Sequence, residues 1–176
     1  MFQYMKSNEF QNGKYWTYNP ANNSNDGTPA SSYRDGSNGY VGYSNVVQNG
    51  GYECYGYANY LAQRIFGKQP AKARSYSGNN RLTAANNHQF LNGWEAITVE
   101  SEITSVRPGD IIQVYYGTNG GHTAMVTSFQ NGVVQVTEVW GSVDNKINWG
   151  YFNGSSSNST LTAIKNKYIT VILRHP

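Results

Sequence analysis

The single cysteine of the chain, Cys54, lies at the start of a segment with helical periodicity. The apolar positions of this segment are Cys54, Ala58, Leu61 and Ile65. Their spacing is that of one face of a helix, and Gly67 and Pro70 follow as stop signals, so we expect a helix with Cys54 in its first turn. Backbone N–H groups and the positive end of the helix dipole favour a thiolate there. Cys54 is therefore a candidate nucleophile, and the alternative interpretation is a small buried hydrophobic residue.

A histidine and a carboxylate follow in the order that thiol acyl transfer requires. His122 begins one β run and Glu138 lies near the end of the next. An imidazole takes or stabilises the thiol proton, and a carboxylate behind it fixes its tautomer. The alternatives are a strand-end histidine that is merely hydrogen-bonded and a solvated edge carboxylate.

The turn between these two runs decides whether His122 and Glu138 share a face of the sheet. We expect a three-residue loop, Gln130-Asn131-Gly132, with Gly132 left-handed and closing a bulge. The predicted face carries His122, Ala124, Val126, Val134, Val136, Glu138 and Trp140. We expect this face to pack against the helix of Cys54. A two-residue loop would separate His122 from Glu138.

Composition indicates one domain of a protein that works outside the cytosol. The chain has 176 residues, a formal net charge of +3 and 13% charged residues, which is about half the usual share. Its polarity comes from Asn, Ser, Gly, Thr and 15 tyrosines. The basic residues form no cluster among the aromatics, so no nucleic-acid partner is expected. We expect a secreted or cell-wall-associated protein whose signal peptide is absent from this sequence, because Met1 to Phe10 holds no apolar core.

Residue types also limit the cofactors and the topology. One cysteine excludes an internal disulfide, and His88, His122 and His175 lack metal-ligand spacing, so neither a metal nor another cofactor is expected. No apolar run approaches the ~20 residues that span a bilayer. The oligomeric state is not predicted.

The order of elements predicts an α+β fold. Residues 1–49 read as a loop-rich aromatic N-terminal arm without a confident helix, and residues 50–176 as the catalytic domain. After the Cys54 helix we expect a short helix over 82–90, then an antiparallel meander. The expected strands are 96–99, 111–116, 122–129, 133–140, 147–152 and 168–173, and we expect a loop over 153–160.

Three motifs resemble the papain-like cell-wall hydrolases of the NlpC/P60 and CHAP families. They are Glu53-Cys54-Tyr55-Gly56-Tyr57, Arg107-Pro108-Gly109-Asp110-Ile111 and Gly121-His122-Thr123-Ala124-Met125-Val126. CHAP domains also carry a glutamate near the end of the next strand, which Glu138 matches. The chain departs from the pattern at Trp140, where CHAP domains usually have asparagine, and at Tyr55, where a small residue is usual.

The resemblance implies a papain-like α+β fold, with N-terminal helices packed on an antiparallel sheet. It implies hydrolysis of an amide in the peptides of peptidoglycan, by an endopeptidase or an N-acetylmuramoyl-L-alanine amidase, with Cys54, His122 and Glu138 as catalytic residues. The expected substrate cleft is lined by Tyr52, Tyr55, Tyr116 and Trp140, with Tyr43 near the oxyanion. Two other functions stay open: a general cysteine peptidase or acyltransferase, and a non-catalytic adhesion module on a degenerate hydrolase scaffold.

Overall fold

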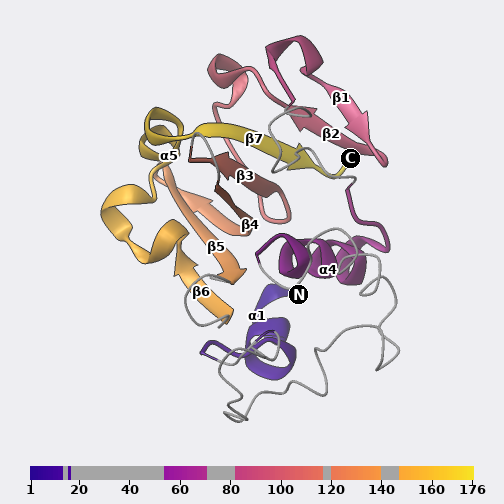
Figure 1. Cartoon of the computed structure of the whole chain (residues 1–176). Coiled ribbons are helices and arrows are strands. Elements are labelled where there is room, and N and C mark those ends of the chain that lie inside the picture. Colours follow the sequence, from indigo (N-terminus) through magenta and orange to yellow (C-terminus); the bar gives the residue numbers. More distant parts are fainter. Residues whose placement is uncertain (14–15, 17–53, 71–81, 117–119, 140–146) are drawn as a thin grey trace.

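The described part of the chain forms an α+β structure around one antiparallel sheet, which confirms the predicted class. The computed structural model describes residues 1–13, 16, 54–70, 82–116, 120–139 and 147–176. Within them the sheet has seven strands in the order β1-β2-β7-β3-β4-β5-β6 (Figure 1). The strands are β1 Gln89–Leu91, β2 Trp94–Ile97, β3 Ile111–Tyr115, β4 Gly121–Gln130, β5 Val133–Val139, β6 Ile147–Tyr151 and β7 Ile169–Arg174.

The last strand does not extend the meander, as the sequence had suggested, but returns to the middle of the sheet. β3, β4, β5 and β6 pair in chain order, whereas β7 pairs with both β2 and β3. All four residues from Thr170 to Leu173 are buried. A strand that is buried on both faces belongs inside a sheet rather than at its edge, which explains this position.

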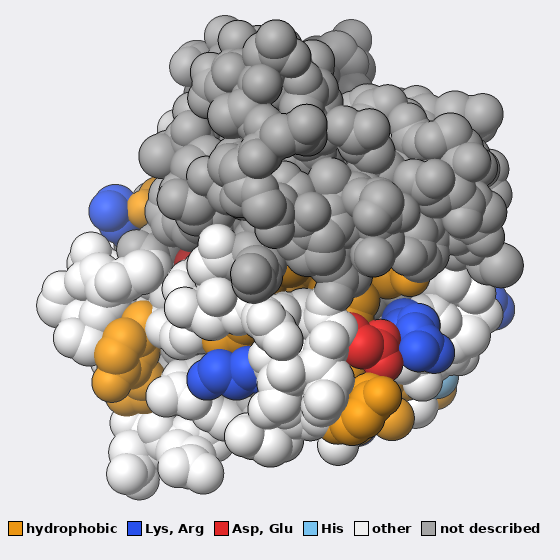
Figure 2. Space-filling view, turned by 90° about the horizontal axis from the view of Figure 1, so that it is seen from below, with side chains coloured by type: hydrophobic (Ala, Val, Ile, Leu, Met, Phe, Trp, Pro, Cys, Tyr) orange, Lys and Arg blue, Asp and Glu red, His pale blue; other side chains and the backbone are white. Residues whose placement is uncertain are grey.

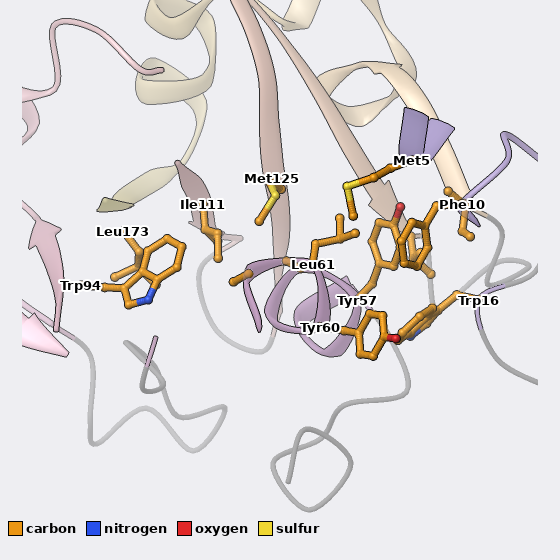
Figure 3. Close-up of a cluster of buried hydrophobic side chains, with 14 of the residues drawn as sticks. Met5, Phe10, Trp16, Tyr57, Tyr60, Leu61, Trp94, Ile111, Met125 and Leu173 are labelled. Carbon is orange, nitrogen blue, oxygen red and sulfur yellow. The ribbon is translucent and has the colours of Figure 1, made fainter. Parts of the chain in front are cut away.

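The predicted helix is α4, Cys54–Phe66, and it ends at Gly67, whose φ of 67° is the left-handed value of a helix stop. Leu61, fully buried, points from α4 toward Ile111 and Met125 of the sheet (Figure 3). The prediction that α4 packs on the face of His122 is wrong. Side chains alternate along β4, so Met125, which contacts α4, faces away from the row that carries His122, Ala124 and Val126.

The face of His122 forms a second core that is covered by a different helix. Its strand residues include Ile112, Val114, Ala124, Val126, Val134 and Val136. Leu161 and Ile164 of α5, Leu161–Lys167, pack on this face. Thr160 caps α5 by accepting a hydrogen bond from the backbone N–H of Ala163 at 3.1 Å. The sequence analysis did not predict α5, because seven residues with two buried apolar side chains give little periodicity.

The hairpin between β4 and β5 has a two-residue loop, so the predicted three-residue loop is wrong. Asn131 and Gly132 both have positive φ, 52° and 77°, as a type I′ turn requires. A β-bulge between Val126 and Ser128 then shifts the register by one residue. Beyond the bulge Val126 pairs with Val136, which is the pairing that a three-residue loop would have given. The described residues of the predicted face therefore come together through the bulge rather than through a longer loop, and Trp140 lies outside the described residues.

The first residues of the chain contain a helix that the sequence analysis did not predict. Phe2–Tyr4 (α1) continues as a π-helix, Met5–Glu9 (η1). Phe10 and Trp16 are buried, and their rings lie 5.1–5.9 Å from those of Tyr57 and Tyr60 on α4 (Figure 3). These aromatic contacts join the described part of the N-terminal segment to the helix that carries Cys54.

Short 3-10 helices occupy much of the remaining described chain. They are η3 Ala84–Asn86, η4 Glu100–Glu102, η5 Phe152–Gly154 and η6 Ser156–Asn158. The predicted helix over 82–90 is limited to η3, because His88 has a φ of 59° and the chain enters β1 directly after it. None of the helices in the described ranges is long and apolar enough to span a membrane.

The Arg107-Pro108-Gly109-Asp110 motif fixes the end of α4 to the start of β3. Gly109 has a φ of 96°, and a Cβ there would lie 2.7 Å from Cζ of Phe66, the last residue of α4. Both the backbone angle and the contact therefore require glycine. The buried Asp110 accepts from the Arg107 backbone N–H at 2.9 Å and pairs with Arg174 of β7 at 2.7 Å.

Charge is dispersed on the surface of the described residues that Figure 2 shows. Lys and Arg side chains stand apart from one another on this face, with small hydrophobic patches between them (Figure 2). This pattern lacks the continuous basic stripe by which proteins track a phosphate backbone.

Truncation of Leu61 tests the packing between α4 and the sheet. Leu61→Ala should lower the free energy of unfolding by about 2–5 kcal/mol, because it leaves a cavity in a fully buried layer. Urea denaturation followed by tryptophan fluorescence measures the change. The control is Thr162→Ala on the exposed side of α5, where we expect a change within about 0.5 kcal/mol. Equal losses in the two variants would contradict this arrangement of the core.

Candidate active site

His122 and Glu138 form a buried hydrogen-bonded pair across the β4–β5 hairpin. Nε2 of His122 lies 2.8 Å from Oε2 of Glu138. His122 is 4% exposed and Glu138 is fully buried. Glu138 lies on the same face as Val134 and Val136, by the alternation of β5, and the bulge aligns that face with His122. We had expected a two-residue loop to separate His122 from Glu138. The loop does have two residues, but the bulge restores the alignment and the two side chains meet.

Asn148 of β6 holds the second oxygen of the carboxylate. Its Nδ2 donates to Oε1 of Glu138 at 3.1 Å, and the two residues are direct cross-strand partners. Both carboxylate oxygens therefore have a donor, which a buried charge requires. The sequence analysis missed Asn148. The pairing of β5 with β6 could have indicated it, because this register places the amide of Asn148 directly opposite Glu138.

Cys54 meets the other side of the imidazole. It is the first residue of α4 and is buried, and its thiol is near enough to raise the pKa of His122. Because Glu138 occupies Nε2, the ring nitrogen that remains for the sulfur is Nδ1. Cys54 begins its helix and His122 is the second residue of β4, so the two elements meet at their ends although α4 covers the opposite face of the sheet.

The surroundings of His122 favour the imidazolium. Burial lowers the pKa of His122, but the hydrogen bonds to Cys54 and Glu138 and the charges of both groups outweigh it and raise the pKa from 6.5 to about 10. The ring is therefore protonated at neutral pH. The thiol of Cys54 and the carboxylate of Glu138 thus both act on this one imidazole.

Phe152 shields this group from the side of the second core. Its ring meets the imidazole edge to face, with the centroids 5.7 Å apart and the planes at 61°. Phe152 is fully buried. An apolar wall strengthens the interactions of the charged groups behind it, because water is kept away from them.

The structure describes two of the five predicted pocket residues. Tyr55 is buried and Tyr116 is 47% exposed, so Tyr116 is the one that offers an open ring. Tyr43, Tyr52 and Trp140 lie outside the described residues. The roles predicted for all five stay predictions.

The other two histidines lie elsewhere. His88 contacts Glu95 at 2.6 Å and Glu102 at 2.7 Å on the surface, and His175 stacks on Phe66 at 4.5 Å. Among the described residues no three side chains of His, Cys, Asp or Glu are grouped so that they could hold a metal ion.

The sequence matches the family model of the CHAP domain over residues 42–139, which is more than half of the chain. The protein therefore belongs to the CHAP family, whose members are hydrolases that act on cell walls. The matched range contains Cys54, His122 and Glu138. Family membership agrees with the resemblance noted from the sequence motifs. No curated protein matches the chain.

Two solved structures are similar to part of the chain. One is the crystal structure of Ly7917 with the hydrolyzing product of MDP, with 14% identity, a TM-score of 0.43, and coverage of 70% of this chain and 54% of that one. The other is the crystal structure of Ly7917, with 14% identity, a TM-score of 0.42, and coverage of 69% and 53%. The chain thus spans about half the length of these proteins.

Titration of His122 tests the geometry without reference to catalysis. The imidazole should remain protonated well above pH 6.5 and lose its proton near pH 10. In Cys54→Ala the pKa should fall, since one of the interactions that raise it is gone while burial continues to lower it. NMR of ring-labelled histidine measures both values, and the exposed His88 in the same spectra is the control. A wild-type pKa of His122 near 6.5 would contradict the described contacts.

Proposed function

We propose that the protein hydrolyses amide bonds in the peptides of peptidoglycan through a Cys54–His122–Glu138 site. The observation that carries this proposal is the buried hydrogen bond between His122 and Glu138, together with the buried thiol of Cys54, which raises the pKa of the same imidazole. A buried ion pair is a poor source of stability, because desolvation offsets its attraction. Groups with strongly perturbed pKa values cluster at functional sites. The family match supports hydrolysis, and the thiol chemistry is our assignment.

In the first half of the reaction, Sγ of Cys54 attacks the carbonyl carbon of the scissile amide as a thiolate. The electron pair of the C=O bond moves to oxygen, and a tetrahedral oxyanion forms. When the C=O bond re-forms, the C–N bond breaks and His122 gives its proton to the leaving amine. The product is a thioester on Cys54 and a free amine.

In the second half, neutral His122 takes a proton from water as the water attacks the thioester. The C–S bond breaks, the acid is released, and the thiolate and imidazolium are restored. Glu138 holds the ring through Nε2 in both halves and stabilises the imidazolium. In this proposal the first-turn N–H groups of α4 would bind the oxyanion, because Cys54 is the first residue of that helix.

The same site would serve a general cysteine peptidase, and a degenerate site would leave only adhesion. The proposal places the reaction at the cell wall, because the chain belongs to a family that acts there. Within this proposal the enzyme is an endopeptidase or an N-acetylmuramoyl-L-alanine amidase. Mass spectrometry of fragments released from purified sacculi separates these two, and a casein substrate separates both from a general peptidase.

Removal of the sulfur tests the enzyme proposal. Cys54→Ala should reduce release of fragments from purified sacculi by about 10³-fold or more, because the nucleophile is lost. Binding to the same sacculi should persist, which a pull-down measures. Wild-type protein should also be alkylated by iodoacetamide at Cys54. If Cys54→Ala released fragments from sacculi as fast as the wild type, the proposal of thiol catalysis would be wrong and an adhesion module would be favoured.

The pH profile tests the role of Glu138. The imidazolium is needed to protonate the leaving amine, so kcat/KM should decline only as pH approaches the pKa of His122, about 10. Glu138→Gln removes a charge and a partner that raise this pKa, so the alkaline limb should move to lower pH. The matched control is Glu100→Gln on the surface, which should keep the wild-type profile. An alkaline limb that does not move in Glu138→Gln would exclude the proposed role.

A further inference from the structure

Two tyrosines extend the face of His122 across the neighbouring strands. Val114 of β3 pairs with His122 on one side and with Thr170 of β7 on the other. Tyr116 lies two residues after Val114, and Tyr168 two residues before Thr170, so both project from the same face at the same end of the sheet. Their rings are 5.0 Å apart with planes at 54°. Figure 1 shows β3 between β4 and β7 at this place.

Tyr116 of this pair is open to solvent, whereas Tyr168 is partly buried against the second core. Tyr116 is 47% exposed. It is a diagonal cross-strand neighbour of His122, which places the two residues about 7–8 Å apart. Gly120 makes room for the ring, since a Cβ there would lie 3.2 Å from Cδ2 of Tyr116. The surface next to the candidate site is therefore aromatic.

A lysine stands at the outer end of this pair. Nζ of Lys167 lies 5.2 Å from the centroid of the Tyr168 ring, within the range of a cation–π contact. Among the described residues no carboxylate lies within ion-pair distance of it. Lys165, two residues earlier on α5, instead donates to the carbonyl of Ile103 at 2.8 Å. The helix dipole favours a cation at the end of α5, and Lys167 lies over the ring of the next residue, Tyr168, beside the exposed Tyr116.

We propose that Tyr116, Tyr168 and Lys167 form a substrate subsite for a peptide that carries a free carboxylate. The rings would pack against the apolar parts of the peptide, and the ammonium group would pair with the carboxylate. Two strand spacings separate β4 from β7, which is about 10 Å. An extended peptide covers that span in about three residues. The inference rests on the proposed function and adds to it: the enzyme selects acidic peptides, with the charge about three residues from the scissile bond.

Paired substrates test this subsite. Two soluble peptides would share one scissile amide and differ at one group about three residues away, a carboxylate in one and a carboxamide in the other. Wild-type protein should cleave the carboxylate peptide with a kcat/KM about fivefold higher, the upper range for an exposed ion pair. The preference should shrink with added salt. Lys167→Gln should bring the ratio to about one, and Lys167→Glu should reverse it.

The matched control is Lys6→Gln, an exposed lysine of the N-terminal helix, which should keep the wild-type ratio. Binding of both peptides to the Cys54→Ala variant, measured by calorimetry, separates two failures. Charge-selective binding without cleavage by the wild type would overturn the proposed function and keep the subsite. Cleavage with equal kcat/KM for the two peptides, or a ratio that Lys167→Gln leaves unchanged, would overturn the subsite.

Discussion

The hydrogen bond between His122 and Glu138 is the constraint on which the described structure depends. Two groups that carry opposite charge are held 2.8 Å apart at the edge of an apolar core. Removing either would leave the other buried without compensation, which in proteins costs about 3–5 kcal/mol. Asn148 of β6 donates a hydrogen bond to one carboxylate oxygen, and Phe152 of η5 packs against the imidazole. The pair on β4 and β5 is thus held by contacts from the segment that follows in the chain.

The helix contributes the sulfur from the opposite side of the sheet. α4 is anchored along its length by Leu61, at its start by Tyr57, whose hydroxyl is 2.8 Å from Oγ1 of Thr137, and at its end by Phe66 against Gly109. None of these contacts involves the face of His122. The relative position of sulfur and imidazole is therefore set by packing that is separate from the proposed chemistry. In the proposed reaction, a helix held in this way would lose little freedom when the thiol and the imidazole act on a substrate.

Sequence reasoning found most elements but not how they face one another. The Cys54 helix, the β4–β5 hairpin and the strands around them follow from local periodicity and turn residues, which a single sequence displays. The side of the sheet that α4 covers depends on tertiary packing. The first half of β4 is buried on both faces, so its own sequence does not show which face meets the helix. Asn148 was missed for a related reason: its role is defined by the partner strand, across a segment where the pattern is weak.

The bulge explains why the pairing of Val126 with Val136 was predicted correctly although the predicted loop length was wrong. The sequence analysis required one extra residue on β4 relative to a tight hairpin in order to place His122 near Glu138. It assigned that residue to the loop, whereas the structure inserts it between Val126 and Ser128. Asn131-Gly132 is a strong signal for a type I′ turn, and that local preference prevailed. Bulges leave no comparable signature in a single chain.

This division of the hairpin has an evolutionary consequence. The nine residues between Val126 and Val136 close the same ladder whether the extra residue is a bulge or part of the turn. A homologous protein of equal length with a longer turn and an unbroken strand would keep the same interior. A sequence alignment of two such chains would need no gap. In space, however, the residues of β4 between the bulge and the turn would be displaced by one position. Superposing them correctly would need a deletion at one point and a compensating insertion at the other.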